Sequence, residues 1–303
     1  MQIYLNPCPM CGNDDSELVT PAYLANKKRC DFQEIRICRT CGLVYKNPNI
    51  PELTGFEYDI GSWGDGKEFG ERLSGVASVL SQQIKTNLKE IIEIGPGPGW
   101  LAKEIHEKWP DARMTLFEPA VEVARIAKKN VPGAAVIPAT FDESGWPGVA
   151  DLVLMCGVDY LLPNIRRTMR KVWLSMADDG VIYIERNVFV ESESFVWLPI
   201  QTQYDLIGVN SMMSTWFNFE QYREWLKMFF YLLSWWEYTV GGSTIHGFLC
   251  RKRQDPVNYW AGKSWYRENK LSLSRLQDDP DPEQPMCKPW YRRMIEGSTH
   301  KGG

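Results

Sequence analysis

Two hydrophobic periods alternate along the middle of the chain, and together they predict an alternating α/β unit. Short, continuously apolar runs are typical of strands buried on both faces, while the segments between them carry apolar residues at helical spacing. The expected strands cover 90–94, 113–117, 135–137, 151–156 and 181–185, and the expected helices cover 67–86, 100–108, 121–130, 166–176 and 219–228. This order predicts a doubly wound, mainly parallel sheet.

The later part of the pattern predicts how this unit closes. Asp179-Gly180 has the composition of a turn and is expected to lead into the last parallel strand. Two further apolar segments, 232–240 and 244–251, flank Gly241-Gly242 and predict a closing hairpin. From residue 254 to residue 303 the periodicity dissolves into prolines, charges and aromatic residues. We expect an irregular extension there, which packs by its aromatic side chains or contacts a protein partner.

The first part of the chain carries two C-x-x-C pairs, each followed by a glycine. Cys8 and Cys11 form the first pair, and Cys38 and Cys41 form the second. Two such pairs are the layout of a zinc ribbon, in which each pair supplies two thiolates. A redox C-x-x-C would need one pair only, and a disulfide pair would need an oxidising compartment, for which no signal peptide is seen. We therefore predict a closed, structural Zn²⁺ site.

A glycine-rich turn follows the first central strand in the stretch KEIIEIGPGPGW. Gly95 and Gly97 fit the start of the dinucleotide fingerprint, but Trp100 takes the place of its third glycine. Pro96 and Pro98 remove two backbone donors that a pyrophosphate would use. No Gly-Lys-Ser/Thr follows, so a P-loop is excluded as well. The turn is therefore expected to hold a ligand other than a dinucleotide or a nucleoside triphosphate.

Two acids complete the pattern around this turn. Glu93 lies two residues before it, and Glu118 ends the next apolar segment. An acid at that second strand end accepts ribose hydroxyls by the logic of dinucleotide folds, and an upstream carboxylate suits an ammonium group. The pattern resembles class I S-adenosylmethionine-dependent methyltransferases over roughly 88–250. The alternative is a tight turn beside a surface acid. The resemblance implies a Rossmann-like fold with S-adenosylmethionine bound by Glu93, Gly95, Pro96, Gly97, Gly99 and Glu118.

Asp142 follows the third strand in the stretch ATFDES. The same resemblance places an acid or amide near the adenine amine at this point. Asp142 has an equally simple alternative, in which its side chain caps a turn. Both interpretations stay open.

A second resemblance begins at the second cysteine pair. The run CRTCGLVYKNPNIPELTGFEYD, 38–59, is similar to the linker of methyltransferases that carry an N-terminal zinc ribbon. That group includes sugar C-methyltransferases and many enzymes of surface-polysaccharide gene clusters. The resemblance implies three parts, a zinc ribbon with linker over 1–60, a class I methyltransferase domain over 61–253 and the extension over 254–303.

The acceptor side of the site departs from that family. The stretch VDYLLPN, 158–164, is similar to its V-L-E-H-L-P-(N/D), with Tyr160 and Leu161 in place of Glu and His. Tyr160 is a candidate base if its pKa is lowered, and Glu185 and Asn187, at the end of the fifth strand, are others. The tryptophans after that strand either stack on an acceptor or pack in the core and lid, and we favour packing for Trp197, Trp216, Trp225, Trp235 and Trp236. The helical spacing of the aromatic residues over 216–226 supports it.

Composition narrows the function classes further. With 303 residues and 44% hydrophobic residues the chain is expected to form one main domain plus additions, and no apolar run reaches a membrane span of about 18 residues. A net charge of −4 provides no overall field for nucleic acid, although local basic clusters exist at 27–29, 166–171 and 251–253. Base-specific methyltransferase motifs are absent as well. We therefore expect a cytoplasmic protein in which nucleic-acid contact is possible but not favoured.

Two classes of function remain. The leading hypothesis is S-adenosylmethionine-dependent methyl transfer to a small polar acceptor such as a nucleotide-linked sugar or a saccharide. Its enzymatic alternative is methylation of nucleic acid or of nucleotides. The other class is a non-catalytic interaction protein that retains the fold and uses the ribbon and the extension for binding.

Overall fold

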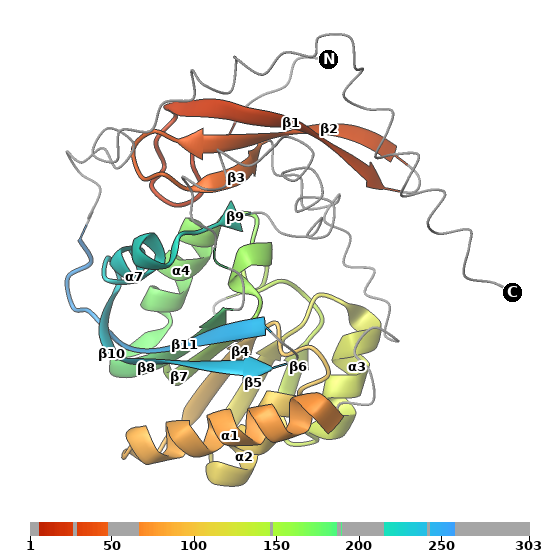
Figure 1. Ribbon diagram of the computed structural model, residues 1–303. Helices are drawn as coiled ribbons and strands as arrows, with labels where there is room; N and C mark the ends of the chain where they lie inside the picture. Colours follow the sequence, from red (N-terminus) through yellow and green to blue (C-terminus); the bar gives the residue numbers. More distant parts are fainter. Residues whose placement is uncertain are drawn as a thin grey trace, which may run out of the picture.

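A seven-stranded sheet forms the centre of the molecule (Figure 1). The structure is a computed structural model that describes residues 6–26, 29–47, 67–145, 148–186, 189, 215–240 and 243–257. The strand order is β10-β11-β8-β7-β4-β5-β6, with β4 to β8 parallel and the hairpin of β10 and β11 antiparallel at one edge. The strands are β4 (Glu90–Ile94), β5 (Arg113–Phe117), β6 (Ala135–Ile137), β7 (Ala150–Cys156), β8 (Met176–Arg186), β10 (Phe230–Val240) and β11 (Ser243–Lys252).

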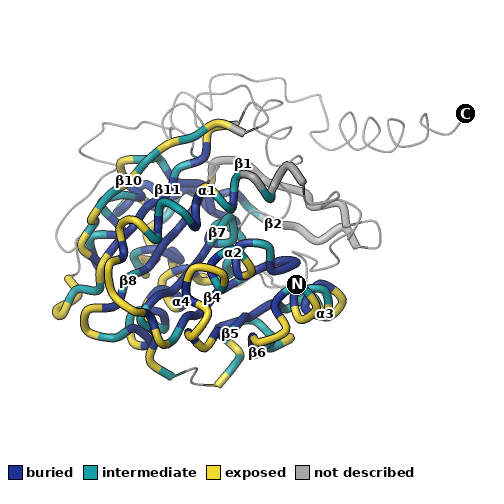
Figure 2. Tube along the Cα trace, turned by 90° about the horizontal axis from the view of Figure 1, so that it is seen from below, coloured by how far each residue is buried: buried dark blue, intermediate teal, exposed yellow. Residues whose placement is uncertain are grey.

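Helices cover both faces of this sheet. They are α1 (Lys67–Gln83), α2 (Trp100–Lys108), α3 (Val121–Asn130), α4 (Ile165–Leu174) and α7 (Phe219–Leu226), with a short 3₁₀ helix, η3 (Asp159–Leu161). Successive side chains of β7 point to opposite faces of the sheet and so belong to two different hydrophobic cores. Leu152 and Leu154 pack with α1, α2 and α3, whereas Val153 and Met155 pack with α4 and α7. The strands between the helices are accordingly the most buried part of the trace (Figure 2).

A second sheet lies beside the α4 and α7 face. Its order is β1-β2-β3-β9, with β1 (Ser16–Asn26), β2 (Arg29–Cys38), β3 (Val44–Asn47) and β9 (Thr215–Trp216). Strand β9 belongs to the later part of the chain and pairs antiparallel with β3 (Figure 1). Met10, Leu43 and Tyr45 share one hydrophobic cluster with Phe217 and Trp225. The N-terminal sheet is therefore packed into one of the two cores.

The predicted fold class is confirmed, and most predicted elements agree with the observed ones. The predicted helices 67–86 and 219–228 end earlier, at Gln83 and Leu226, and the closing hairpin is longer than expected. The linker after residue 47 and nearly all of the predicted extension lie outside the described residues. Within the described part of the chain, no helix combines the length and hydropathy that crossing a membrane requires.

One predicted helix end and one predicted turn around β8 are wrong. The helix predicted over 166–176 is α4, which ends at Leu174, and Met176 already belongs to β8. The turn predicted at Asp179-Gly180 lies within that strand, because β8 bulges. Ala150 pairs with Met176, yet Leu152, two residues later, pairs with Val181. The extra residues of β8 are accommodated in this bulge instead of a separate turn.

Candidate active site and metal centre

The glycine-rich turn joins β4 to α2 at the carboxyl end of the parallel strands. Gly95, Gly97 and Gly99 have φ angles of 66°, 56° and 80°, which residues with a side chain rarely adopt. A Cβ atom on Gly95 would lie 2.7 Å from Val158 Cγ2, so this turn passes closely beside the end of β7. The predicted contact of these glycines with a cofactor stays a prediction.

Glu118 lies beside this turn, as its place at the end of β5 predicts. Its carboxylate accepts hydrogen bonds from the backbone N–H groups of Gly97, at 3.1 Å, and Ala120, at 2.9 Å. The residue is buried, which raises its pKa, and the two N–H groups partly oppose that shift. A carboxylate offers about four lone-pair positions, so acceptor capacity remains for further donors.

Glu93, at the end of β4, has fewer partners. Only 1% of the residue is exposed, and its Oε2 atom has no hydrogen-bond partner. Burial raises the pKa of Glu93 to about 8, and the charges of Glu118 and Glu185 add to the shift. A buried acid in this situation favours a cation or a hydrogen-bond donor beside it.

Asp142 follows β6, and one of its two carboxylate oxygens accepts a hydrogen bond. Thr168 Oγ1 donates to Asp142 Oδ2 at 2.6 Å, while Asp142 Oδ1 is buried without a partner. The adjacent turn is capped by another residue, since Thr140 Oγ1 accepts from the backbone N–H of Glu143 at 3.2 Å. Asp142 therefore keeps one oxygen for a donor, and its expected contact with adenine stays a prediction.

Tyr160 lies in η3, directly after β7. Its ring faces Arg186, whose guanidinium carbon is 5.5 Å from the ring centroid. Burial raises the pKa of Tyr160 to about 12, and the neighbouring Asp159 adds to the shift. The lowered pKa that a basic phenol would need is therefore not found, and at neutral pH this hydroxyl is a hydrogen-bond donor or acceptor.

Glu185, near the end of β8, is surrounded by donors. Arg72 of α1 donates to Oε1 at 2.8 Å, Tyr183 donates to Oε2 at 3.2 Å, and Tyr238 also donates to Oε2. Only 2% of Glu185 is exposed. Both oxygens are thus engaged, which suits a positioning role better than proton abstraction. Asn187 lies outside the described residues.

Sequence reasoning missed a buried ion pair at this edge of the sheet. Arg186 donates to Asp159 Oδ2 at 2.6 Å, and neither side chain is exposed. Arg186 also donates to the backbone oxygen of Thr215 at 3.2 Å. Its guanidinium carbon lies 4.8 Å from the centroid of the Phe217 ring. A sequence signal for this pair does exist. Asp159 follows shortly after the buried strand β7, and Arg186 ends the next strand, β8.

Three buried polar atoms around this ion pair have no partner. They are Asp159 Oδ1, Thr215 Oγ1 and the hydroxyl of Tyr222. Buried polar groups are normally hydrogen-bonded, so a polar group of a ligand or an internal water molecule would be favoured here. The region around this ion pair thus has more polar character than its aromatic composition suggests.

The aromatic residues after β8 are mainly packing residues. Trp216 and Trp225 are almost completely buried, and Trp236 stacks on Tyr183 with centroids 5.4 Å apart. Trp235 is 41% exposed, and Trp197 lies outside the described residues. The packing interpretation is confirmed for Trp216 and Trp225.

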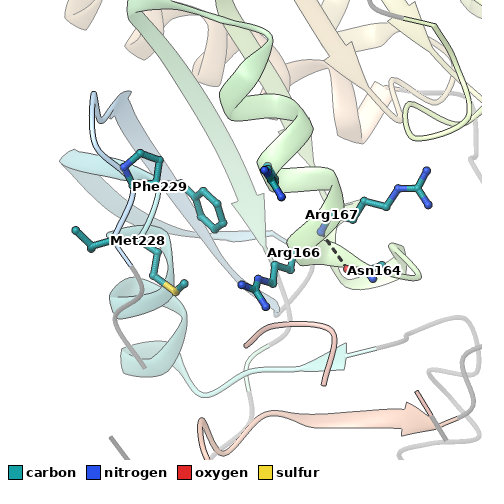
Figure 3. Close-up of a pocket in the computed structure, with 8 residues that line it drawn as sticks. Asn164, Arg166, Arg167, Met228 and Phe229 are labelled. Atoms are coloured by element: carbon teal, nitrogen blue, oxygen red, sulfur yellow. Dashed lines mark hydrogen bonds between the residues drawn. The ribbon is translucent and has the colours of Figure 1, made fainter. Parts of the chain in front are cut away.

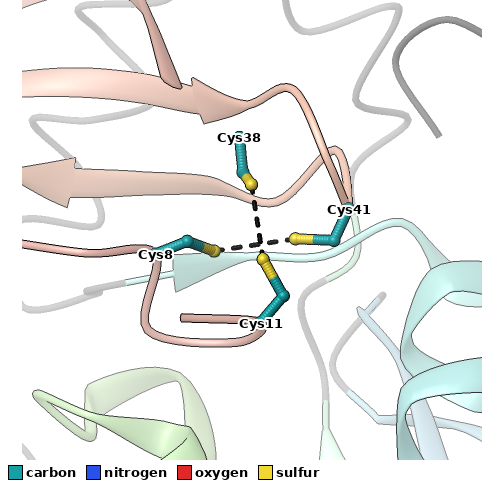
Figure 4. A group of neighbouring side chains, drawn as sticks. All are labelled: Cys8, Cys11, Cys38 and Cys41. Atoms are coloured by element: carbon teal, nitrogen blue, oxygen red, sulfur yellow. Dashed lines mark hydrogen bonds between the residues drawn. The ribbon is translucent and has the colours of Figure 1, made fainter. Parts of the chain in front are cut away.

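The four predicted zinc ligands lie together (Figure 4). All four sulfur atoms are within 4.8 Å of one another, with 3.6 Å between Cys8 and Cys41 and 3.5 Å between Cys11 and Cys38. Tetrahedral thiolates at about 2.3 Å from Zn²⁺ would stand about 3.8 Å apart, and no further ligand position would be needed. The donor set and its spacing therefore fit a structural zinc ion.

Side chains and backbone groups hold both cysteine pairs against the helices. Arg166 of α4 donates through its backbone N–H to the Pro9 oxygen at 3.0 Å and through Nη1 to the Cys11 oxygen at 2.8 Å. Gln221 of α7 donates through Nε2 to the Cys41 oxygen at 3.0 Å. The candidate metal centre is thus anchored to α4 and α7, the helices that cover one face of the sheet.

Several known proteins are similar to parts of this chain. Trans-aconitate 2-methyltransferase of Rhodopseudomonas palustris strain BisA53 is 24% identical over 115 residues, which are 38% of this chain and 45% of that protein. The enzyme of that name from Afipia carboxidovorans is 21% identical over 115 residues. The chain therefore spans less than half the length of these curated relatives. The N-methyltransferase NodS from Bradyrhizobium japonicum WM9, solved with S-adenosyl-L-homocysteine, is 12% identical, with a TM-score of 0.50 over 67% of this chain and 97% of NodS.

The family assignment rests on a longer match. Residues 69–229, more than half of the chain, match the protein family described as "Methyltransferase domain". The mainly parallel sheet flanked by helices is also the fold shared with NodS. With the glycine turn at the carboxyl end of β4 and an acid at the end of β5, the chain belongs to the methyltransferase domain family and carries a class I methyltransferase domain.

Proposed function

We propose that this protein transfers a methyl group from S-adenosylmethionine to a small polar acceptor. The observation that carries the proposal is the pair of buried acids at the glycine turn. Glu93 Oε2 has no partner, and Glu118 is held against Gly97 with acceptor capacity remaining. A cofactor that combines an ammonium group with a ribose diol would supply donors to both.

Each predicted cofactor residue has a separate role in this proposal. Glu118 accepts the ribose hydroxyls, Glu93 attracts the ammonium group, and Asp142 Oδ1 accepts from the adenine amine. The backbone of Gly95, Pro96, Gly97 and Gly99 lies against the amino-acid part. S-adenosylmethionine supplies an activated methyl group through its sulfonium, so the protein contributes mainly orientation of the acceptor.

On the acceptor side, Tyr160 and Glu185 are proposed to act together without a strong base. The Tyr160 phenol has a raised pKa and would orient an acceptor by hydrogen bonding. Glu185 would hold the side chains of Arg72 and Tyr238 in place by accepting their hydrogen bonds. An acceptor that must lose a proton of high pKa would then require a further group.

A sugar-like acceptor is the favoured substrate class. Its support is the likeness of 38–59 to the linker of sugar methyltransferases with an N-terminal zinc ribbon. The similar proteins include trans-aconitate 2-methyltransferases and an N-methyltransferase, so carboxylate and amine acceptors are the competing classes. Methylation of nucleic acid and a non-catalytic binding role are less favoured than any of these small acceptors.

We also propose that the protein binds a structural Zn²⁺ ion and that the chain is divided into three segments. The ion is bound by Cys8, Cys11, Cys38 and Cys41, and four thiolates suit a reducing compartment such as the cytoplasm. The ribbon and linker cover 1–60, the methyltransferase domain covers 61–253, and the extension over 254–303 is a candidate contact for a protein partner.

Calorimetric titration with S-adenosylmethionine tests the cofactor site. We expect micromolar binding to the zinc-loaded protein and binding at least about tenfold weaker in Glu93→Gln, which cannot become charged beside the ammonium. Glu107→Gln, an exposed position on α2, is the matched control and should bind as tightly as the original chain. No binding by well-folded protein would rule out the enzyme and leave the interaction protein.

Transfer of a labelled methyl group then separates the acceptor classes. Nucleotide-linked sugars, tricarboxylates such as trans-aconitate, amines and short RNA are offered in parallel. Labelling of a nucleotide-linked sugar or saccharide is the expected result. Labelling of only a carboxylate, an amine or RNA would retain methyl transfer and reject the sugar-like acceptor.

A further inference from the structure

A hollow of about 430 Å³ lies beside α4, on the side of α7 and β10 (Figure 3). Its volume is in the range of small-molecule sites, which are commonly about 300–1,000 Å³. The lining combines residues from the start to the middle of α4 with the segment that joins α7 to β10 and with the last described residues. The lining residues are Asn164, Arg166, Arg167, Arg170, Met228, Phe229, Pro256 and Val257.

Three arginines give this hollow a strong positive charge. Arg166 and Arg170 are four residues apart and share one face of α4, and α4 contains no acidic residue. None of the lining residues is acidic, and no ion pair within the described residues involves Arg166, Arg167 or Arg170. Like charges at this spacing repel each other, so an anion in the hollow would relieve an existing repulsion.

One of these guanidinium groups is already fixed in place. Arg166 Nη1 donates to the Cys11 oxygen at 2.8 Å, and the remaining N–H groups of Arg166 are available on the same side chain. Figure 3 shows Arg166 reaching toward Met228. A fixed guanidinium loses less side-chain entropy when it binds an anion than a freely moving surface arginine does.

The opposite wall is apolar. Met228 and Phe229 are buried there with only 4% and 7% of their surface exposed, and Val257 at the rim is 42% exposed. The wall has a defined backbone, because the Val257 N–H donates to the Met228 oxygen at 2.9 Å and the Arg253 N–H donates to the Phe229 oxygen at 3.0 Å. The hollow thus offers cationic donors on one side and an apolar surface on the other.

We propose that this hollow binds a small phosphorylated ligand, with its phosphate on the arginines of α4 and its organic part on the wall of Met228, Phe229 and Val257. Phosphate oxygens accept from two guanidinium groups at once, which matches Arg166 and Arg170 on one helix face. The lining contains none of the residues assigned as cofactor or zinc ligands.

A small ligand fits these observations better than a nucleic-acid backbone. The hollow is bounded by an apolar wall, whereas a nucleic-acid track needs charges that continue along the surface. Lys171, the next basic residue of α4, donates to the backbone oxygens of Phe141 and Ser144. Its charge is therefore directed to the β6 side and does not extend the cluster.

Calorimetry on the full-length, zinc-loaded protein tests this site with pyrophosphate, ADP and a short single-stranded RNA. We expect one molecule of pyrophosphate or ADP to bind, with affinity about tenfold weaker in Arg170→Gln. Val257→Asp places a negative charge on an exposed rim position and should weaken ADP in the same way. Arg125→Gln on α3, an exposed arginine with no part in the hollow, is the matched control.

The outcomes separate clearly, because circular dichroism and zinc content report folding of each variant independently. Selective loss in Arg170→Gln and Val257→Asp, with Arg125→Gln unchanged, supports the proposal. Equal affinity in all variants would overturn it, as would failure of pyrophosphate and ADP to bind. Binding of RNA alone would overturn it as well, because the arginines would then belong to a polyanion surface.

Discussion

Glu93 and Glu185 are two buried acids near the ends of β4 and β8, the two strands that flank β7, and their surroundings differ in one respect. Arg72 and two tyrosines donate to Glu185, whereas Glu93 Oε2 has no donor. A carboxylate without a counter-charge in a buried site favours its protonated form. Glu93 is therefore the residue at which ligand binding, protonation and stability are linked most directly.

The first prediction concerns the pH dependence of stability without cofactor. The pKa of Glu93 is about 8 in the folded protein and 4.5 in its ordinary state, so the folded protein holds the proton more tightly. The resulting stabilisation is fully present below pH 4.5 and is lost as pH rises toward 8. Glu93→Gln lacks this loss, so its stability relative to the original chain should rise by on the order of 3 kcal/mol over that window.

Urea unfolding at several pH values measures this difference. The variant and the original chain are compared below pH 5 and above pH 8, with Glu107→Gln as a surface control. A difference in unfolding free energy that stays constant with pH would show that Glu93 ionises freely, and the proposed link would fail.

The second prediction concerns the buried pair of Asp159 and Arg186. Asp159→Asn removes the carboxylate charge beside a guanidinium that has no exposed surface, and such changes cost about 3–5 kcal/mol. The matched control is Glu90→Gln, which removes the partner of the exposed Arg113 and should cost less than about 1 kcal/mol. Chemical unfolding gives both values, and equal costs would contradict a structural role for the buried pair.

Local patterns predicted one part of the site better than another. The four cysteines and the glycine turn are encoded by short spacings, and they lie where these spacings place them. The pairing of Asp159 with Arg186 depends on which strands are neighbours and on burial by β9. The raised pKa of Tyr160 depends on the same burial, which a sequence motif does not report.

At the level of elements, β8 shows why boundaries were harder to predict than element types. Continuous apolar residues predicted the strand correctly, and Asp179-Gly180 looked like a turn because glycine favours turns. In the sheet this glycine is required for a different reason. A Cβ atom on Gly180 would lie 2.9 Å from the Ala177 oxygen and 3.0 Å from the Ala150 oxygen, so the bulge needs a residue without a side chain.

The third prediction compares two glycine substitutions. Gly180→Ala should destabilise the protein by about 1–3 kcal/mol, because backbone oxygens of two strands would have to move. Gly75→Ala, in the middle of α1 with no atom near the added Cβ, should stabilise it by about 0.5–1 kcal/mol through helix propensity. Thermal unfolding of both variants measures the contrast. Equal shifts of the same sign would mean that the bulge adapts to a side chain.

On the scale of the whole molecule, the N-terminal sheet is joined to the methyltransferase domain by more than proximity. Strand β9 pairs with β3, the core residues of both parts form one cluster, and Gln221 donates to the Cys41 oxygen. Thr215 of β9 in turn accepts from Arg186, the partner of Asp159. A continuous set of contacts therefore runs from the second cysteine pair to the buried pair of Asp159 and Arg186.

This connection leads to the fourth prediction, which concerns removal of the metal. A structural Zn²⁺ ion commonly contributes about 10 kcal/mol or more to the fold of its segment. Because β9 is held by β3, chelation or Cys41→Ser should loosen β9 together with the ribbon. Hydrogen exchange of the backbone should accelerate at least about tenfold at both Val44–Asn47 and Thr215–Trp216.

The opposite face of the sheet provides the internal control for this experiment. Helix α3 packs in the other hydrophobic core, through Ala127, so its exchange should change little. Faster exchange at α3 to the same degree would indicate global unfolding. If only the N-terminal strands lost protection while Thr215 and Trp216 kept theirs, the ribbon would be an independent unit. Metal binding would then have no route through β9 to the buried pair of Asp159 and Arg186.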